Sequence, residues 1–245
     1  MINFENTDVY GWEAAIRGMR NPMNSLRKSD SIFLRSGTVE IGENDLKLMK
    51  QLVKAGTDHS KFMRMITVTV DITAPLYWWK EFDTYKVGTV RNSCSTMHKI
   101  HEKEFTLDDF SHEHLNIAGI DILERSIAAL NEWRAYFVYG FDSCEYKIEK
   151  GDKEQWWQMI QLLPSSYNQR ATVQLNYAVL RNMYHSRKNH KLDEWSQGFT
   201  KWVESLPYSE LITEEYECRQ IAHYADENRR MKEQIEQLIK EYEKC

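Results

Sequence analysis

The sequence predicts an α+β fold, mostly helical with a small sheet. The chain has 10 glycines and 4 prolines among 245 residues, and so few breakers leave long stretches available to helices. One segment, residues 65–73 (MITVTVDIT), instead alternates β-branched and polar side chains as a half-buried strand does. With 42% hydrophobic and 28% charged residues, a chain of this length can bury a sizeable core.

The N-terminal half is predicted to place this strand after two short helices. A first helix over residues 9–19 ends in the turn-prone segment 20–25. Asn44 is the expected N-cap of a second helix, which ends near Ala55, just before Gly56. The apolar stripe of this helix is formed by Leu46, Met49, Leu52 and Val53.

The rest of the chain is predicted to be largely helical. Pro75 suits the first turn of a helix that follows the strand and contains the aromatic segment 75–85. Five more helices are expected, over residues 117–138, 152–162, 166–187, 192–206 and 213–244. The last one carries dense Glu and Lys, so we expect a solvated helix that packs one apolar stripe on its own domain or on a partner subunit.

The domain organisation is predicted to be simple. No internal repeat, low-complexity segment or linker rich in Gly, Ser or Pro divides the chain. We therefore expect one domain over residues 1–212 and a C-terminal helical tail over residues 213–245.

Charge, cysteine usage and hydropathy disfavour several classes of protein. A net charge of −5 argues against binding to a nucleic acid polymer, although it leaves room for a local basic pocket. The four cysteines contain no C-x-x-C pair, so they indicate neither a disulfide framework nor a zinc site. No apolar run approaches the roughly 20 residues that cross a bilayer, and the N-terminus does not resemble a signal peptide. We expect a cytoplasmic, reduced protein with no membrane partner.

The common sequence motifs of nucleotide binding and catalysis are absent. There is no G-x-G-x-x-G, G-x-x-x-x-G-K-[ST] or G-x-S-x-G, so a bound cofactor would be held by other residues. Four histidines at metal-compatible spacing lie in one polar stretch, but they lack H-E-x-x-H and a cysteine partner. We expect exposed loop histidines and no metal site at His98, His101, His112 and His114.

A first unusual segment, residues 77–98, passes from paired aromatics and ionisable groups into a run of hydroxyl and thiol side chains. Small polar residues in a loop after a helix can offer N–H and hydroxyl donors to a phosphate or a carbonyl. An aromatic core helix followed by an ordinary Ser/Thr loop explains the same composition. Both interpretations stay open.

A second unusual segment, residues 163–187, places polar groups on an apolar helix. If one helix spans 166–187, Asn176 and Arg187 are eleven positions apart, three turns on, and share a face with Leu180. An Asn and an Arg are costly to bury there without a partner. An anionic, hydrogen-bonding ligand would be such a partner, and so would a structural carboxylate.

Together the two segments resemble the flavin-dependent thymidylate synthase family, ThyX. The second segment fits the family spacing L-P-x(5)-R-x(5)-N-x(3)-L-x-N-x(4)-R without a gap. The matching residues are Leu163, Pro164, Arg170, Asn176, Leu180, Asn182 and Arg187. Upstream, Arg17 and Arg20 resemble a family A-x-R-x-x-R, and downstream His190 and Glu194 resemble an H-x-x-x-E that begins one residue early. The resemblance covers about residues 13–194.

The first segment matches the family signature R-H-R-x(7)-S only in outline. The three leading places read Thr84-Tyr85-Lys86, and a count of seven further residues ends at Cys94. One insertion gives Ser95 instead, which also aligns Asn92 with a family Asn and is the alignment we prefer. Several phosphate-binding arginines of the family are missing, and Met97 and Ile160 stand in the places of two of them.

The resemblance implies a set of site residues. It assigns nucleotide binding to Glu81, Ser93, Cys94, Ser95, Thr96 and Arg187. It assigns cofactor binding to Asn176, Asn182, Ser186 and His190. The residues that it implies in catalysis are Tyr85, Lys86, Ser95 and Arg187.

The resemblance also implies a fold and a reaction. The fold is a twisted, mainly antiparallel sheet flanked by helices, with a helix-rich C-terminal half, in a homotetramer whose sites lie between subunits. The reaction is FAD-dependent one-carbon transfer to C5 of a pyrimidine deoxynucleotide, dUMP to dTMP, with methylenetetrahydrofolate and NADPH as co-substrates. Two alternatives stay open: a diverged enzyme that, for example, hydroxymethylates a pyrimidine nucleotide, and a catalytically retired nucleotide-binding or assembly protein.

Overall fold

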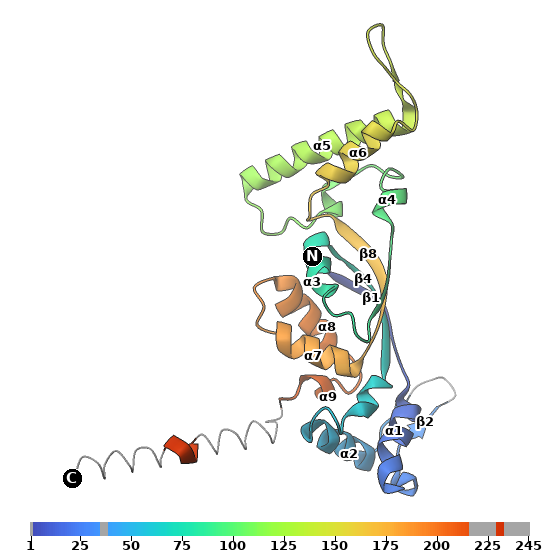
Figure 1. Cartoon of the computed structure of the whole chain (residues 1–245), viewed down its shortest axis with the longest axis vertical. Coiled ribbons are helices and arrows are strands. Elements are labelled where there is room, and N and C mark those ends of the chain that lie inside the picture. The colour runs from blue at the N-terminus through green and yellow to red at the C-terminus, as the bar shows by residue number, and fades with distance from the viewer. Residues whose placement is uncertain (1, 35–38, 216–228, 233–245) are drawn as a thin grey trace, which may run out of the picture.

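A four-stranded antiparallel sheet forms the centre of the computed structural model, which describes residues 2–34, 39–215 and 229–232 (Figure 1). Its spatial order is β1 (Asn3–Tyr10), β4 (Thr67–Pro75), β8 (Asn168–Asn176) and β5 (Val90–Ser93). Every neighbouring pair in the sheet is antiparallel. With helices packed around this sheet, the α+β fold class is confirmed.

The two central strands each have one apolar face. Alternate residues of β4 and β8 are buried because strand side chains point to opposite faces in turn. The alternating buried residues are Val68, Val70, Ile72, Ala74, Ala171, Val173 and Leu175. Each fully buried Val, Ile or Leu contributes on the order of 1.5–3 kcal/mol. This face joins the main core with α3 (Leu76–Phe82), α7 (Tyr177–Arg187) and α8 (Thr200–Glu204).

The predicted helix over residues 9–19 is wrong at its start, because Val9 and Tyr10 extend β1. The helix α1 (Trp12–Arg20) begins two residues later. Between the two elements, Gly11 has φ +90°, and a Cβ there would lie 2.0 Å from the Met65 carbonyl oxygen. A glycine is therefore needed for the strand to turn directly into the helix.

The second helix begins slightly earlier than the sequence predicts. α2 (Glu43–Lys54) has Gly42 rather than Asn44 as its N-cap. The N–H groups of Asn44 and Asp45 donate to the carboxylate oxygens of Asp30, at 2.9 and 3.1 Å. A side chain from another segment thus caps this helix, which the local sequence does not reveal. Short elements around it are η1 (Asn21–Met23), η2 (Leu26–Lys28), β2 (Ile32–Phe33), β3 (Val39–Glu40) and η3 (Lys61–Arg64).

The predicted helix over residues 166–187 is wrong in its first half. Residues 168–176 form β8, which pairs with both β4 and β5. Asn176 ends this strand, and its Oδ1 accepts the N–H of Val179 at 3.1 Å as the N-cap of α7. The proposed shared helix face of Asn176 and Arg187 therefore does not exist, because Arg187 lies at the far end of α7. Buried and exposed side chains instead alternate along β8 with a period of two residues, as in a strand with one face on the core.

A smaller helical unit lies beyond one end of the sheet (Figure 1). It contains α5 (Ile117–Tyr139) and α6 (Lys153–Leu162), which confirm the helices predicted over 117–138 and 152–162. Its core is separate from the main one and is formed by Ile100, Phe105, Phe110, Leu123, Ile127, Leu130 and Met159. The remaining elements here are α4 (Thr96–Lys99), η4 (Leu107–Asp109), β6 (Phe141–Asp142) and β7 (Lys147–Ile148).

The C-terminal elements differ partly from expectation. The helix predicted over 192–206 is a π-helix (Glu194–Phe199) that continues into α8. α9 (Glu210–Thr213) follows, and most of the predicted tail over 213–245, including most of the helix over 213–244, lies outside the described residues. Among the described helices, none is long and apolar enough to cross a membrane.

Candidate active site

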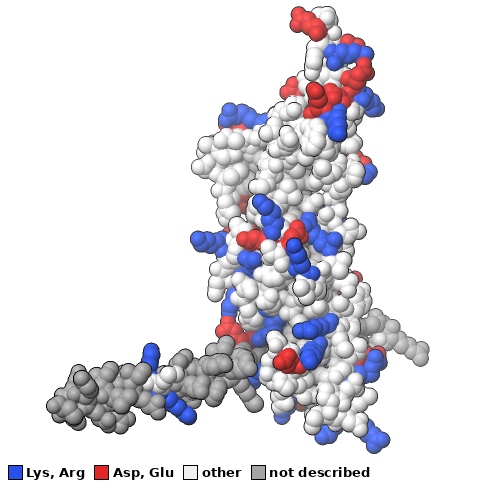
Figure 2. All heavy atoms as spheres, in the orientation of Figure 1, with Lys and Arg blue, Asp and Glu red and all other residues white. Residues whose placement is uncertain are grey.

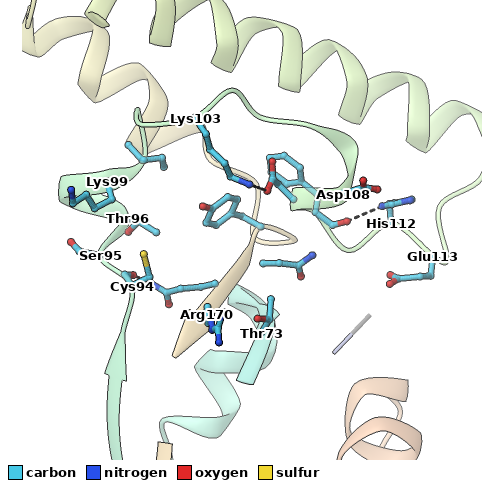
Figure 3. Close-up of a pocket in the computed structure, with 16 residues that line it drawn as sticks. Thr73, Cys94, Ser95, Thr96, Lys99, Lys103, Asp108, His112, Glu113 and Arg170 are labelled. Atoms are coloured by element: carbon cyan, nitrogen blue, oxygen red, sulfur yellow. Dashed lines mark hydrogen bonds and ion pairs between the residues drawn. The ribbon is translucent and has the colours of Figure 1, made fainter. Parts of the chain in front are cut away.

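A pocket of about 480 Å³ opens where the start of β8 meets the end of β5 and α4 (Figure 3). Pockets of this size suit small-molecule ligands. Three of the predicted nucleotide residues, Cys94, Ser95 and Thr96, form one wall. Residues 167–170 of the segment that enters β8 line it as well, together with side chains from 99–113.

Hydrogen bonds to neighbouring residues fix the wall formed by Cys94, Ser95 and Thr96. The Cys94 N–H donates to the Arg170 carbonyl oxygen at 2.9 Å, and Ser95 Oγ accepts the N–H of His98 at 3.3 Å as the N-cap of α4. Ser93 precedes this wall as the last residue of β5, paired with Ala171. Both interpretations placed this run in a loop, which is wrong for Ser93 at the end of β5 and for Thr96 at the start of α4.

The cationic side chains that line the pocket are all ion-paired. Lys99 pairs with Glu102, and Lys103 pairs with Asp109. Arg170 donates to Asp71 at 2.8 Å. The lining is therefore nearly balanced in charge, and it contains no arginine that replaces those missing at Met97 and Ile160.

Asp71 anchors Arg170 from the neighbouring strand β4. Its carboxylate accepts hydrogen bonds from Thr172 at 2.6 Å, from Asn6 at 2.9 Å and from Arg170. These three hydrogen bonds and the Arg170 charge lower the pKa of Asp71 to about 2. Asp71 thus stays ionised at neutral pH and holds Arg170 against the sheet.

A second cluster surrounds Arg187 at the end of α7. Arg187 Nε donates to the Tyr85 hydroxyl at 2.9 Å, and its NH1 lies 3.5 Å from Glu81 Oε2. The guanidinium carbon lies 5.2 Å from the Trp195 ring centroid and 5.5 Å from that of Tyr85. Cation–π attraction and the hydrogen bond both restrict the side chain. Four residues predicted from the sequence, Glu81, Tyr85, Arg187 and His190, are brought together here.

Glu81 contacts three other side chains of this cluster, those of Arg187, Trp195 and His190. Its Oε2 accepts the indole N–H of Trp195 at 2.6 Å and lies 3.4 Å from His190 Nε2. Trp195 was not expected at the site, and no motif in the sequence indicates it. It is fully buried in the π-helix, where the chain turns back onto α3.

Glu194 is a second link between the π-helix and α3. The Tyr77 hydroxyl donates a short hydrogen bond to its buried carboxylate. Burial, together with Glu194, raises the pKa of Tyr77, so the phenol remains a protonated donor. The resemblance of His190 and Glu194 to the family's H-x-x-x-E thus corresponds to two contacts with α3.

The predicted cofactor residues on α7 lie in different surroundings. Asn182 and Ser186 are exposed and one helical turn apart, and no hydrogen bond of their side chains occurs within the described ranges. Asn176 uses its Oδ1 for the helix cap. The exposed amide and hydroxyl fit a polar ligand such as a flavin, whereas Asn176 can offer only the rest of its amide. Lys86, predicted in catalysis, is exposed in the loop before β5.

One chain does not bring all predicted site residues together. Cys94 is hydrogen-bonded to the start of β8, whereas Asn176 lies at its end. At about 3.4 Å per residue, the two regions are on the order of 20 Å apart along the strand.

Two other groups of predicted residues have structural roles. Arg20, which resembles a family arginine, is buried in an ion pair with Asp45, and Arg17 pairs with Glu13 on the surface. The expectation of exposed loop histidines holds for His114 only, because His98 lies in α4 and His101 and His112 are half-buried. His112 Nδ1 lies 2.8 Å from the Phe110 carbonyl oxygen. No group of three or more metal-ligating side chains occurs among the described residues.

Acidic and basic side chains are interspersed on the face of the molecule shown in Figure 2, which has no extended basic area. Such a face lacks the electrostatic pattern that binds a polyanion.

This architecture defines the fold class: the chain has a fold similar to that of the ThyX flavin-dependent thymidylate synthases. It is similar to ThyX from Helicobacter pylori complexed with FAD and dUMP, with a TM-score of 0.59 and 15% identity over 86% of this chain and 97% of that one. It is also similar to the UMP/dUMP methylase PolB from Streptomyces cacaoi bound with 5-Br dUMP, with a TM-score of 0.54 and 13% identity over 87% of this chain and 95% of that one. No protein-family model and no curated protein matches the chain in sequence.

Proposed function

We propose that this protein is an FAD-dependent enzyme that transfers a one-carbon unit to C5 of a pyrimidine nucleotide. The observation that carries this proposal is the cluster around Arg187. Residues 81–85 and 187–190 are about a hundred positions apart in sequence, and the side chains expected from the resemblance meet there. The two similar structures, which contain dUMP or 5-Br dUMP, support the same class of ligand.

In this proposal each residue of the cluster has a defined task. Arg187 donates hydrogen bonds to the nucleotide, and Glu81 and Tyr85 hold its guanidinium in one orientation. Buried Trp195 keeps water from the inner side of the cluster. Asn182 and Ser186 hold the flavin from the exposed face of α7, with Asn176 and His190 at its ends. The flavin, when bound, supplies the redox chemistry, with NADPH and methylenetetrahydrofolate as co-substrates.

The separation along β8 supports an active site shared between subunits. We propose a homotetramer in which the Cys94–Thr96 wall of one copy faces the α7 surface of another. Such an arrangement completes the site without movement inside one chain.

The first prediction concerns assembly and flavin. The purified protein is expected to be a tetramer that binds FAD, because the Cys94–Thr96 wall and the flavin residues proposed on α7 lie at opposite ends of β8 in one chain. Light scattering combined with a flavin titration tests both points. A monomer that binds no flavin at high micromolar FAD would contradict the proposal and favour the catalytically retired alternative.

The second prediction concerns the substrate. Two guanidinium groups of the family signature are absent at Thr84-Tyr85-Lys86, and the lysines of the pocket are already paired. A single ammonium holds a phosphate without the forked geometry of arginine. With dUMP, methylenetetrahydrofolate, NADPH and FAD, we therefore expect little dTMP, and a panel of pyrimidine nucleotides analysed by mass to give a better substrate or a hydroxymethylated product. Rapid conversion of dUMP to dTMP would show that the lost arginines are compensated and that ordinary thymidylate synthesis is the activity.

A further inference from the structure

Arg91 lies at the centre of a polar network that no sequence motif indicates. It projects from the edge strand β5 toward the covered side of the sheet, opposite buried Val173, and its side chain is 18% exposed. Its guanidinium carbon lies 3.9 Å from the centroid of the Trp79 ring. Its NH1 donates to both carboxylate oxygens of Asp83, at 2.7 and 2.8 Å. α3 and the residue that follows it therefore fix the guanidinium.

The second terminal nitrogen of the Arg91 guanidinium, NH2, is hydrogen-bonded to Gln169. Arg91 NH2 donates to Gln169 Oε1 at 2.6 Å, and Gln169 Nε2 donates to the Cys94 carbonyl oxygen at 2.8 Å. A flip of this amide would place a donor against a donor and an acceptor against an acceptor, so Arg91 decides its orientation. The main chain of Gln169 is fixed as well, because Trp79 Nε1 donates to its carbonyl oxygen at 2.9 Å.

Gln169 and the Cys94 segment both line the pocket. The Cys94 carbonyl accepts from the Gln169 amide, and the Cys94 N–H donates to the next carbonyl, that of Arg170. The backbone at Cys94 is thus held on both sides by the start of β8. Arg91 touches neither the pocket nor the wall, and it acts on both through one side-chain amide.

We propose that Arg91 is a positioning residue, which fixes the Cys94–Thr96 wall of the pocket through Gln169. The wall is the part of the site assigned above to the nucleotide, so the consequence for binding rests on the proposed function. The positioning itself does not. A guanidinium is needed because it contacts Asp83, Gln169 and the Trp79 ring at once, which an ammonium cannot do with the same geometry.

The first test is amide hydrogen exchange of the segment 92–97 in the full-length protein without ligand. Arg91→Gln and Gln169→Leu are each expected to accelerate exchange at Cys94 by about five- to tenfold, since a hydrogen bond that orders the segment is lost. Arg91→Lys is expected to resemble Arg91→Gln. Arg125→Gln, which removes an exposed arginine of α5 paired with Asp121, is the matched control and is expected to leave this segment unchanged. Unchanged exchange in both Arg91→Gln and Gln169→Leu would overturn the proposal.

The second test measures dUMP and FAD binding of the same variants by calorimetry. A misplaced wall is expected to weaken dUMP binding roughly tenfold and to leave FAD binding unchanged, because the flavin residues lie on α7 or next to its ends. If exchange responds but the unmodified protein binds no dUMP, the positioning role stands and the proposed function fails. If dUMP binds equally to all variants, the positioning role for the ligand is wrong. Should Arg91→Gln fail to fold, Gln169→Leu decides the question, because it leaves Arg91 paired with Asp83.

Discussion

Replacement of Asp45 by asparagine is expected to lower the free energy of unfolding by about 3–5 kcal/mol, because it leaves a buried guanidinium without its counter-charge. Asp45 is fully buried and Arg20 is 4% exposed, and the two are joined at 2.5 Å between Nε and Oδ1. The other carboxylate oxygen accepts the hydroxyls of Ser29 and Ser31 at 2.6 and 2.7 Å. One carboxylate thus ties α1, α2 and the intervening segment together.

Thermal unfolding measures this effect. For a chain of this size, a loss of that magnitude lowers Tm by roughly 10 °C. Glu13→Gln is the matched control, since it breaks an exposed i,i+4 pair with Arg17 and is expected to change stability by less than about 0.5 kcal/mol. An Asp45→Asn variant with the same Tm as the unmodified protein would show that the buried ion pair does not contribute to stability.

The same residue gives the stability a pH dependence. Burial by itself would raise the pKa of Asp45, but hydrogen bonds from Ser29, Ser31 and Arg20 and the Arg20 charge hold it below its usual value. A lowered pKa in the folded state means that the contribution is present above the ordinary Asp pKa of about 4. It is expected to be lost as the pH falls through the folded-state pKa, and Asp45→Asn is expected to lack this acid-dependent component.

Arg187→Ala is expected to weaken nucleotide binding by roughly ten- to a hundred-fold while the fold remains intact. A charge-assisted hydrogen bond to a ligand contributes on the order of 1.5–3 kcal/mol, and each 1.4 kcal/mol corresponds to a factor of ten in affinity. The side chain lies at the edge of the core, 20% exposed, and Glu81 keeps Trp195 and His190 as neighbours after its removal.

Calorimetric titration with dUMP and 5-Br dUMP tests this expectation. Lys188→Ala, which removes the neighbouring cation at the C-cap of α7, is the control and is expected to bind nucleotide as the unmodified protein does. Arg187→Lys is expected to restore part of the affinity, because an ammonium keeps the charge but cannot both donate to Tyr85 and stack on Trp195. An Arg187→Ala variant that has a lower Tm but binds nucleotide as tightly as the unmodified protein would assign Arg187 a structural role.

Some features of the fold follow from short stretches of sequence. The strand over 65–73 and the helices over 117–138 and 152–162 occur where their patterns predict them, each within about two residues. In these segments the hydrophobic periodicity and the residues at the ends indicate the same secondary structure. The choice between strand and helix therefore does not depend on contacts with another segment. The resemblance to the ThyX family selected Glu81, Tyr85, Arg187 and His190, which meet at the second cluster.

The fold class and the helices over 117–138 and 152–162 follow from the sequence alone, and the family resemblance names four of the side chains that meet at Arg187, but not Trp195. The pairing of 168–176 with β4 and β5 decided between strand and helix there, because the local alternation of Ala171, Val173 and Leu175 with polar residues is too short to decide by itself. The tertiary structure also decided the roles of Arg20, Arg91 and Trp195. Their hydrogen-bond partners lie 25, 78 and 114 positions away in the sequence. Contacts between such distant residues produce no repeating pattern in the sequence from which they could be predicted. A local sequence pattern indicates only the secondary structure that a segment favours. The partner of a buried charge or of a hydrogen-bonded side-chain amide depends on which segment the fold places next to it.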